Sequence, residues 1–388
     1  MKLTEGQIAY CMECGVCTGS CPVARSYEDF SPRLIIKNLL VDGKEKVTQS
    51  RTLWRCITCA RCSVRCPALI DIPRVVNEYR EKAFKIGVVP EPSHHAVLHI
   101  IPKLQLRRPS QNRTGWASKW RTRDHGEYFY FVGCAPYFNP VFEYLGIRPL
   151  NVPEAVLTLL NAVEIEPVVS NEEVCCGHDA LWTGDEETFA QLARRNVEVI
   201  KRSGARTVIF SCPEGYTTFK QDYPEVVGEL PFEVVYVSEF LAGKLDLLKD
   251  CLTNGNDAEL VTYHDPCRLG RFDGIYDSPR MLLDAVSGAE RFEMERTREN
   301  ALCCGTSAWI ECSSCSKAIQ FDRLEEAHNT LPSGNGGNRI LITSCPKCFI
   351  HLNCAKTALP EDSPGKNLQI EDLYVFLSRH IAREKKDV

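Results

Sequence analysis

Cysteine is the residue type that could do chemistry in this chain of 388 residues, which contains 21 cysteines gathered in clumps. Clumped thiols in a reducing compartment indicate metal or redox chemistry, whereas disulfide frameworks are typical of short secreted chains. The N-terminal residues lack the long apolar stretch of a signal peptide. We therefore predict a cytoplasmic metal-binding or redox protein.

The first 90 residues contain two cysteine runs with the same spacing, each ending in Cys-Pro. In two-cluster ferredoxins, three cysteines spaced in this way hold one cluster, and the cysteine before proline completes the other cluster. The runs thus predict two cubane 4Fe–4S clusters, held by Cys11, Cys14, Cys17 and Cys66 and by Cys56, Cys59, Cys62 and Cys21. Structural zinc sites are the alternative, but separated Cys-x-x-Cys pairs do not explain two triplets.

Beyond residue 126 three motifs occur twice in the same order, a single Cys, a Cys-Cys-Gly and a Ser-Cys-Pro, which indicates duplication. The first copy contains Cys134, Cys175, Cys176 and Cys212, and the second contains Cys267, Cys303, Cys304, Cys345 and Cys348. Adjacent cysteines cannot easily ligate a single zinc ion, although they can bind different irons of a larger cluster. The alternative is that some of these thiols are buried small hydrophobes.

The elements around these motifs alternate between strand and helix. The apolar runs 207–210 and 340–343 lead directly into the two Ser-Cys-Pro turns, and a helix capped by Asp185 follows the first Cys-Cys-Gly. Another helix is expected to start at Ser31-Pro32. We predict an α/β protein, in which an N-terminal helical two-cluster ferredoxin-like domain precedes a duplicated α/β domain with short parallel sheets. The cysteines would lie at the carboxyl ends of the strands.

The predicted parts are residues 1–90, a basic linker at 91–126, the first copy at 127–250 and the second copy at 251–388. Trp116 and Trp120 interrupt the basic stretch of the linker. Its cations are Lys103, Arg107, Arg108, Arg113, Lys119, Arg121 and Arg123. Such a segment could dock on an acidic partner or a membrane surface, or could simply be a solubilising linker.

The Cys-Cys-Gly copies resemble the CCG domains of heterodisulfide reductase catalytic subunits, which also occur in glycolate, lactate and glycerol-3-phosphate dehydrogenases. The segment from Cys14 to Pro22 resembles the small ferredoxin-like subunit of the same reductases, so the chain looks like a fused form. The resemblance implies that five cysteines of the second copy hold a noncubane 4Fe–4S cluster at the substrate. In the first copy Gly215 replaces the fifth cysteine, so that site would hold a four-cysteine cluster or none.

Three kinds of residue near the second copy are candidates for further roles. Arg268, Arg271 and Arg280 would offset cluster charge or bind an anionic substrate, or else form a solvated face. His264 would deliver a proton to a leaving thiolate, or would be a structural histidine. We expect Trp309, where glycines are usual in the family, to line an open substrate pocket together with residues near His264 and Arg268.

Four other cysteines are not assigned to clusters. Cys312 and Cys315 would form a redox pair or an extra ligand set, with free thiols as the favoured alternative. Cys251 and Cys354 are isolated and are given no role.

The net charge of −5 predicts no nucleic-acid binding, and no apolar run approaches the ~20 residues of a membrane span. There is no Gly-x-Gly-x-x-Gly motif for a dinucleotide. A partner flavoprotein would therefore deliver electrons, through the two cubanes, to the second copy, which would reduce a small-molecule or protein disulfide. One alternative is a relay between a dehydrogenase and a quinone-reducing membrane protein. The other is a zinc-stabilised scaffold.

Overall fold

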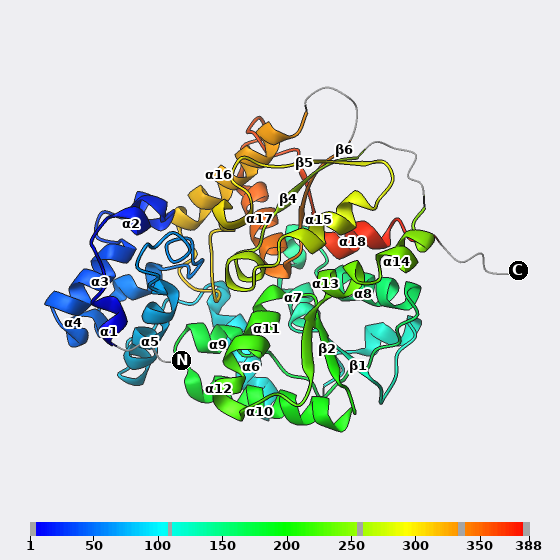
Figure 1. Ribbon diagram of the computed structural model, residues 1–388, viewed down its shortest axis with the longest axis horizontal. Coiled ribbons are helices and arrows are strands. Elements are labelled where there is room, and N and C mark those ends of the chain that lie inside the picture. The colour runs from blue at the N-terminus through cyan, green and yellow to red at the C-terminus, as the bar shows by residue number, and fades with distance from the viewer. Residues whose placement is uncertain (1–4, 108–110, 254–258, 333–337, 383–388) are drawn as a thin grey trace, which may run out of the picture.

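The computed structural model describes residues 5–107, 111–253, 259–332 and 338–382. Figure 1 shows a helical N-terminal lobe beside two α/β units, one for each copy of the repeat. Within the described residues no helix is both long and apolar enough to cross a membrane.

The N-terminal lobe consists of helices around an apolar core, to which Ile310, Cys315 and Ile319 of copy two also contribute. Ser31 caps one of them as predicted, because its Oγ accepts a hydrogen bond from the backbone N–H of Leu34 at 3.1 Å. The helices are α1 (Glu5–Ile8), α2 (Val16–Ser20), α3 (Pro32–Val41), α4 (Lys44–Thr48) and α5 (Ile72–Lys85).

Copy one contains a parallel three-stranded sheet in the order β1-β2-β3. Its strands are β1 (Tyr128–Phe131), β2 (Thr207–Phe210) and β3 (Glu233–Tyr236). Asp185 caps the long helix α10 as predicted, since its Oδ1 accepts from Thr188 N at 3.1 Å. The helices are α7 (Ala135–Val141), α8 (Asn151–Ala162), α9 (His178–Trp182), α10 (Glu186–Arg202), α11 (Pro213–Thr217), α12 (Pro224–Val227), α13 (Val237–Ala242) and α14 (Leu245–Cys251).

Copy two repeats this sheet with one added edge strand, in the order β5-β4-β6-β7, all parallel. Its strands are β4 (Glu259–His264), β5 (Ala289–Phe292), β6 (Asn338–Thr343) and β7 (Gln369–Asp372). Its helices are α15 (Asp277–Asp284), α16 (Ser314–Thr330), α17 (Pro346–Ala358) and α18 (Leu373–Ser378). In both copies the first strand (β1 or β4) leads to the single Cys, and β2 or β6 beside it leads to Ser-Cys-Pro, so the predicted fold class is confirmed.

The two copies share one apolar core, which contains residues of both sheets. Helix α18 of copy two packs on α8 of copy one. The Tyr236 hydroxyl, on β3, lies within hydrogen-bonding distance of the carbonyl oxygens of Ser211 and Ser344, which precede the two equivalent Cys-Pro turns. The two cysteine sites are therefore held in a fixed relation to each other.

The basic segment packs on copy one, where it forms α6 (Val97–Arg107). Arg113 is 3% exposed and pairs with the buried Glu173 at 2.8 Å. Trp116 and Trp120 pack against the shared core. Salt bridges to copy one also engage Lys103, Arg121 and Arg123. Much of this positive charge is thus compensated within the chain, which weakens the interpretation that it docks on a partner.

Candidate functional site

The first predicted cubane site lies at the surface of the N-terminal lobe. Cys11, Cys14, Cys17 and Cys66 line one cavity with an empty volume of about 400 Å³. Cys14 is exposed and the other three are half-buried. The structure thus brings Cys66 to the first cysteine run, as crossed ligand sets require. Four thiols around one cavity fit a cubane cluster.

The second predicted cubane site is deeper in the lobe. Cys21, Cys59 and Cys62 are buried and Cys56 is half-buried. Burial raises the pKa of Cys62, and the nearby charges of Cys56, Cys59 and Cys21 raise it further. The four thiols of the second set are therefore close neighbours, and the two sites differ mainly in their access to solvent.

A buried arginine holds the loop that carries Cys56 and Cys59, here called the second cubane loop, against copy one. Arg80 of α5 has no exposed surface, and it donates to the backbone oxygens of Leu53 at 2.9 Å, Cys56 at 2.6 Å and Trp182 at 3.0 Å. Gly184, just beyond Trp182, has φ +83°, and a Cβ there would lie 2.5 Å from the Arg80 carbonyl oxygen. No sequence pattern singles out Arg80, because an arginine on an amphipathic helix usually faces solvent.

The second cubane loop contacts the cysteines of copy two. Cys59 belongs to one buried cluster with Cys303, Cys304, Cys345 and Cys348. The Cys303 side chain packs against Cys59 and is the largest of the influences that lower the pKa of Cys59. Because Cys59 is a predicted cubane ligand, the second cubane site and the copy-two site are in direct contact.

The copy-two cysteines lie on loops that follow the strands. Strand β4 leads to Cys267 and β6 leads to Cys345, whose Sγ accepts from the backbone N–H of Cys348 at 3.5 Å. The Cys-Cys-Gly glycine is required here, because Gly305 has φ +88° and a Cβ would lie 2.6 Å from the carbonyl oxygen of Ser316. The loop therefore passes directly over the start of α16.

Several buried donors near these thiols have no hydrogen-bond partner among the described residues. They are His264 Nε2, Arg268 Nη1, Arg271 Nη2 and Thr306 Oγ1. Buried donors are normally satisfied, and hydrogen bonds to the sulfurs are typical of protein-bound iron–sulfur clusters. Five thiols with unpaired donors close by thus fit an iron–sulfur cluster at copy two.

Arg268 and Arg271 lie between the cubane loop and copy two. The Arg268 guanidinium stands 4.1 Å from the Trp182 ring and donates to Thr58 Oγ1 at 2.8 Å. Arg271 Nε donates to the backbone oxygen of Cys59 at 2.6 Å. The interpretation that they form a solvated face is therefore wrong. Their positions suit the offsetting of cluster charge.

His264 and Arg280 have side-chain partners that hold them in place. The His264 side chain is fully buried, and its Nδ1 accepts from Arg323 Nε at 3.1 Å. Burial, with a further contribution from Arg323, lowers the pKa of His264 to about 3, so the ring is neutral near pH 7. The idea that it delivers a proton to a leaving thiolate is thus not supported. Arg280 is bound to both oxygens of Asp265, at 2.8 and 2.9 Å, and is structural.

The expectation that Trp309 lines an open pocket is wrong. Trp309 is 1% exposed and stacks on Phe142 with ring centroids 5.1 Å apart. Its carbonyl oxygen accepts from the backbone N–H of Ser93 at 2.8 Å. The segment before α6 and the end of α7 cover this side of copy two. This long-range contact has no signal in the residues around Trp309.

Copy one keeps four neighbouring thiols, three of which line one cavity. Cys134 and Cys175 have Sγ atoms 3.8 Å apart. Cys134, Cys176 and Cys212 line a cavity with an empty volume of about 500 Å³, which Gly215 also borders. A Cβ at Gly215 would meet no atom closer than 3.4 Å, so the absence of the fifth cysteine is not forced by space. The four thiols fit a four-cysteine cluster.

An unexpected network of buried charges connects the two copies. Lys347, in the second Cys-Pro turn, pairs with Asp179 and, at 2.5 Å, with Glu214 in the first Cys-Pro turn. His178 Nε2 lies 3.3 Å from Glu214. His178, Asp179 and Glu214 are close enough to hold a metal ion, but the Lys347 ammonium already pairs with both carboxylates. Opposite charges at equivalent repeat positions are the only sequence signal for this contact.

The remaining four cysteines are not among the predicted ligands. Cys312 is exposed, whereas Cys315 is buried in the core of the N-terminal lobe. Cys354 Sγ accepts from Lys317 Nζ at 3.0 Å, and Cys251 Sγ donates to a backbone oxygen at 3.4 Å. None of the four is shown to be a ligand.

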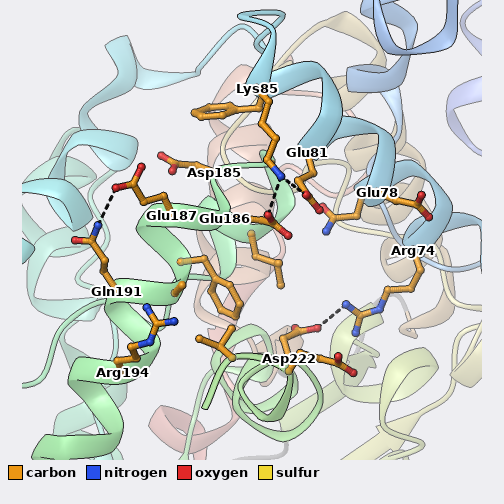
Figure 2. Close-up of a pocket in the computed structure, with 18 residues that line it drawn as sticks. Arg74, Glu78, Glu81, Lys85, Asp185, Glu186, Glu187, Gln191, Arg194 and Asp222 are labelled. Atoms are coloured by element: carbon orange, nitrogen blue, oxygen red, sulfur yellow. Dashed lines mark hydrogen bonds and ion pairs between the residues drawn. The ribbon is translucent and has the colours of Figure 1, made fainter. Parts of the chain in front are cut away.

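A groove lies between α5 and copy one, and no cysteine lines it. Lys85 pairs with Glu81 at 2.5 Å and with Glu186 at 3.1 Å, as Figure 2 shows. Arg74 pairs with Asp222 at 2.5 Å on the other side of the groove. The bridges to Glu186 and Asp222 attach the lobe to copy one, whereas the pair with Glu81 lies within α5.

Comparison with known proteins agrees with this arrangement. Residues 128–220 and 261–353 match the cysteine-rich CCG domain family, and residues 7–70 match the 4Fe–4S dicluster domain family. The chain therefore combines a 4Fe–4S dicluster domain with two cysteine-rich CCG domains, and it is related to heterodisulfide reductase subunits. It is thus a subunit of an iron–sulfur oxidoreductase.

Three curated relatives show the range of this similarity. A subunit of the dihydromethanophenazine:CoB–CoM heterodisulfide reductase of Methanosarcina mazei is 29% identical over 373 residues, which cover 92% of this chain and 83% of that protein. The EtfAB:quinone oxidoreductase of Syntrophomonas wolfei is 27% identical and is matched over 91% of this chain but 56% of its own length. A subunit of the fumarate reductase (CoM/CoB) of Methanothermobacter marburgensis is 27% identical, with 92% and 69% covered.

Proposed function

We propose that the chain carries electrons from a partner flavoprotein, through the two cubane sites, to copy two, where a disulfide or thiol-linked substrate is reduced. The contact between Cys59 and Cys303 is the observation that carries this proposal, because it joins the second cubane site to the copy-two site. When bound, iron–sulfur clusters supply one-electron redox chemistry. Electrons would enter near Cys14, the exposed cysteine of the first set.

The side chains of this path have defined tasks in the proposal. Arg268 and Arg271 hold the cubane loop on copy two and place positive charge between the two sites. Arg80 fixes the other side of the same loop. The copy-two thiolates would hold the five-cysteine noncubane cluster that the family resemblance implies. Reduction of the disulfide uses two electrons and two protons and releases two thiols.

Reoxidation of the reduced protein by a disulfide tests this function. The full chain is reduced with dithionite and mixed with a small disulfide. Samples are frozen at successive times, and the paramagnetic signals of the cubanes are measured by electron paramagnetic resonance. Cys348→Ser should abolish the reoxidation by the disulfide and leave cubane reduction intact. Cys354→Ser is the matched control, because Cys354 lies outside the predicted ligand sets. Unchanged reoxidation in Cys348→Ser would exclude copy two as the terminal site.

The second candidate is a relay to a quinone-linked membrane partner. It is favoured by the burial of Cys303, Cys304, Cys345 and Cys348 and by the closed position of Trp309. One relative is named an EtfAB:quinone oxidoreductase. The relay would be supported if no disulfide tried reoxidises the reduced protein, while a quinone-linked partner reoxidises it rapidly.

A further inference from the structure

His264 has one ring nitrogen bound and the other unpaired. It is the last residue of β4, three positions before Cys267, and its side chain has no exposed surface. Nδ1 accepts from Arg323 Nε at 3.1 Å, while Nε2 is buried without a partner among the described residues. A buried polar atom without a partner is unusual and calls for an explanation.

The contact with Arg323 fixes which nitrogen carries the proton. A guanidinium group has only donors, so Nδ1 must be the acceptor, and the hydrogen of the neutral ring must be on Nε2. Arg323 is itself fully buried, and its Nη1 donates to Glu326 at 2.8 Å and to the Arg296 carbonyl oxygen at 2.9 Å. The guanidinium is therefore held in place, and the His264 tautomer is set by the protein.

The unpaired N–H lies at the copy-two site. Helix α16 contacts both His264 and Cys304 within one helical turn, because Arg323 Nε donates to His264 Nδ1 and Gln320 Nε2 donates to the carbonyl oxygen of Cys304 at 3.1 Å. We propose that His264 Nε2–H donates a hydrogen bond to a sulfur of the cluster held by Cys267, Cys303, Cys304, Cys345 and Cys348, and that Arg323 positions it. This inference rests on the proposed function only in that copy two must hold a cluster.

Such a hydrogen bond has a measurable consequence. It stabilises the more negative, reduced cluster more than the oxidised cluster, and so raises the reduction potential. At a fixed solution potential, His264→Phe should lower the ratio of reduced to oxidised cluster about tenfold, as expected for one hydrogen bond to a charged group. For a one-electron couple this is about 59 mV. Arg323→Met should give a smaller shift in the same direction, because the tautomer is no longer imposed.

The experiment is a redox titration of the full chain, monitored by the paramagnetic signal of copy two. In protein labelled with ¹⁵N-histidine, pulsed electron paramagnetic resonance should detect a coupling between a ring nitrogen and that signal. His264→Phe should remove this coupling. His380→Phe is the matched control, because His380 is also buried but bonds to Phe376 O and pairs with Glu259 at the end of the chain. The cubane potentials should be unchanged in all variants.

The outcomes separate this inference from the proposed function. A wild-type chain without any copy-two signal would overturn both. A copy-two signal without ¹⁵N coupling, or a potential unchanged in His264→Phe, would overturn the role of His264 alone. A coupling seen only after a disulfide is added would mean that His264 faces substrate, which also contradicts the proposal. If His264→Phe does not fold, the coupling in the wild-type chain decides.

Discussion

Replacing Gly184 by alanine should loosen the N-terminal lobe from copy one. Gly184 has φ +83°, where an L-residue is strained by ~1–2 kcal/mol. Its added Cβ would also lie 2.5 Å from the Arg80 carbonyl oxygen and 2.9 Å from the Cα of Glu81. These are backbone atoms of α5, so the helix has to shift, and overpacking of this kind adds ~1–3 kcal/mol. The free energy of unfolding should therefore fall by roughly 2–5 kcal/mol.

Gly204→Ala provides the matched control, because Gly204 has φ +74° but no atom within 4 Å of the added Cβ. Its cost should be the strain alone, ~1–2 kcal/mol. Urea unfolding of both variants measures the difference. Gly184→Ala should also slow reoxidation of the cubanes by a disulfide, since a shifted α5 weakens the hold of Arg80 on the loop of Cys56 and Cys59. Equal destabilisation by the two variants would refute the close packing of α5 on copy one.

Three further predictions concern the ligand sets and the core. Cys66→Ser should remove the cluster of the Cys11–Cys17 loop and spare the cluster of the Cys56–Cys62 loop, whereas Cys21→Ser should do the reverse. Electron paramagnetic resonance spectra of the two variants measure which cluster is lost. Gly215→Cys should complete a five-cysteine set in copy one and change its iron content and spectrum, with Gly215→Ser as the control; no difference between the two would argue against a cluster there. Burial raises the pKa of Asp372 to about 8. The folded state therefore holds a proton that the unfolded state loses near pH 4, and stability falls with rising pH by up to about 1.4 kcal/mol per unit across this window. Asp372→Asn should flatten that slope in unfolding measurements, and an unchanged slope would assign it to another group.

Local signals in the sequence are sufficient for the elements and the motifs. The Ser31 and Asp185 caps act within one helical turn, so they are readable from a few residues. The strand at 207–210 is a short apolar run between turn residues, and it occurs as predicted. The repeat indicates two equivalent units, because the same motifs recur in the same order.

Contacts between the parts are not readable in this way. Cys59 and Cys303 are far apart in sequence, and nothing in either motif shows that they meet. Arg80 resembles an ordinary helix cation until copy one supplies the Trp182 carbonyl oxygen. The position of Trp309 after the Cys-Cys-Gly motif predicts that it faces a cavity, yet residues around Ser93 and Phe142 bury it. These positions depend on tertiary packing, for which the sequence contains no short-range pattern.

The charge network gives a physical reason for one difference between the two copies. Lys347 and Glu214 occupy equivalent positions of the two Cys-Pro turns and meet in the buried centre of the molecule. Two lysines or two glutamates there would place like charges together without water, which is strongly unfavourable. Once the copies pack face to face, charged residues at these two positions must be of opposite sign, as Lys347 and Glu214 are. The turn that carries Glu214 is also the one in which Gly215 replaces the last cysteine, so the copies differ at their shared centre both in charge and in ligand number.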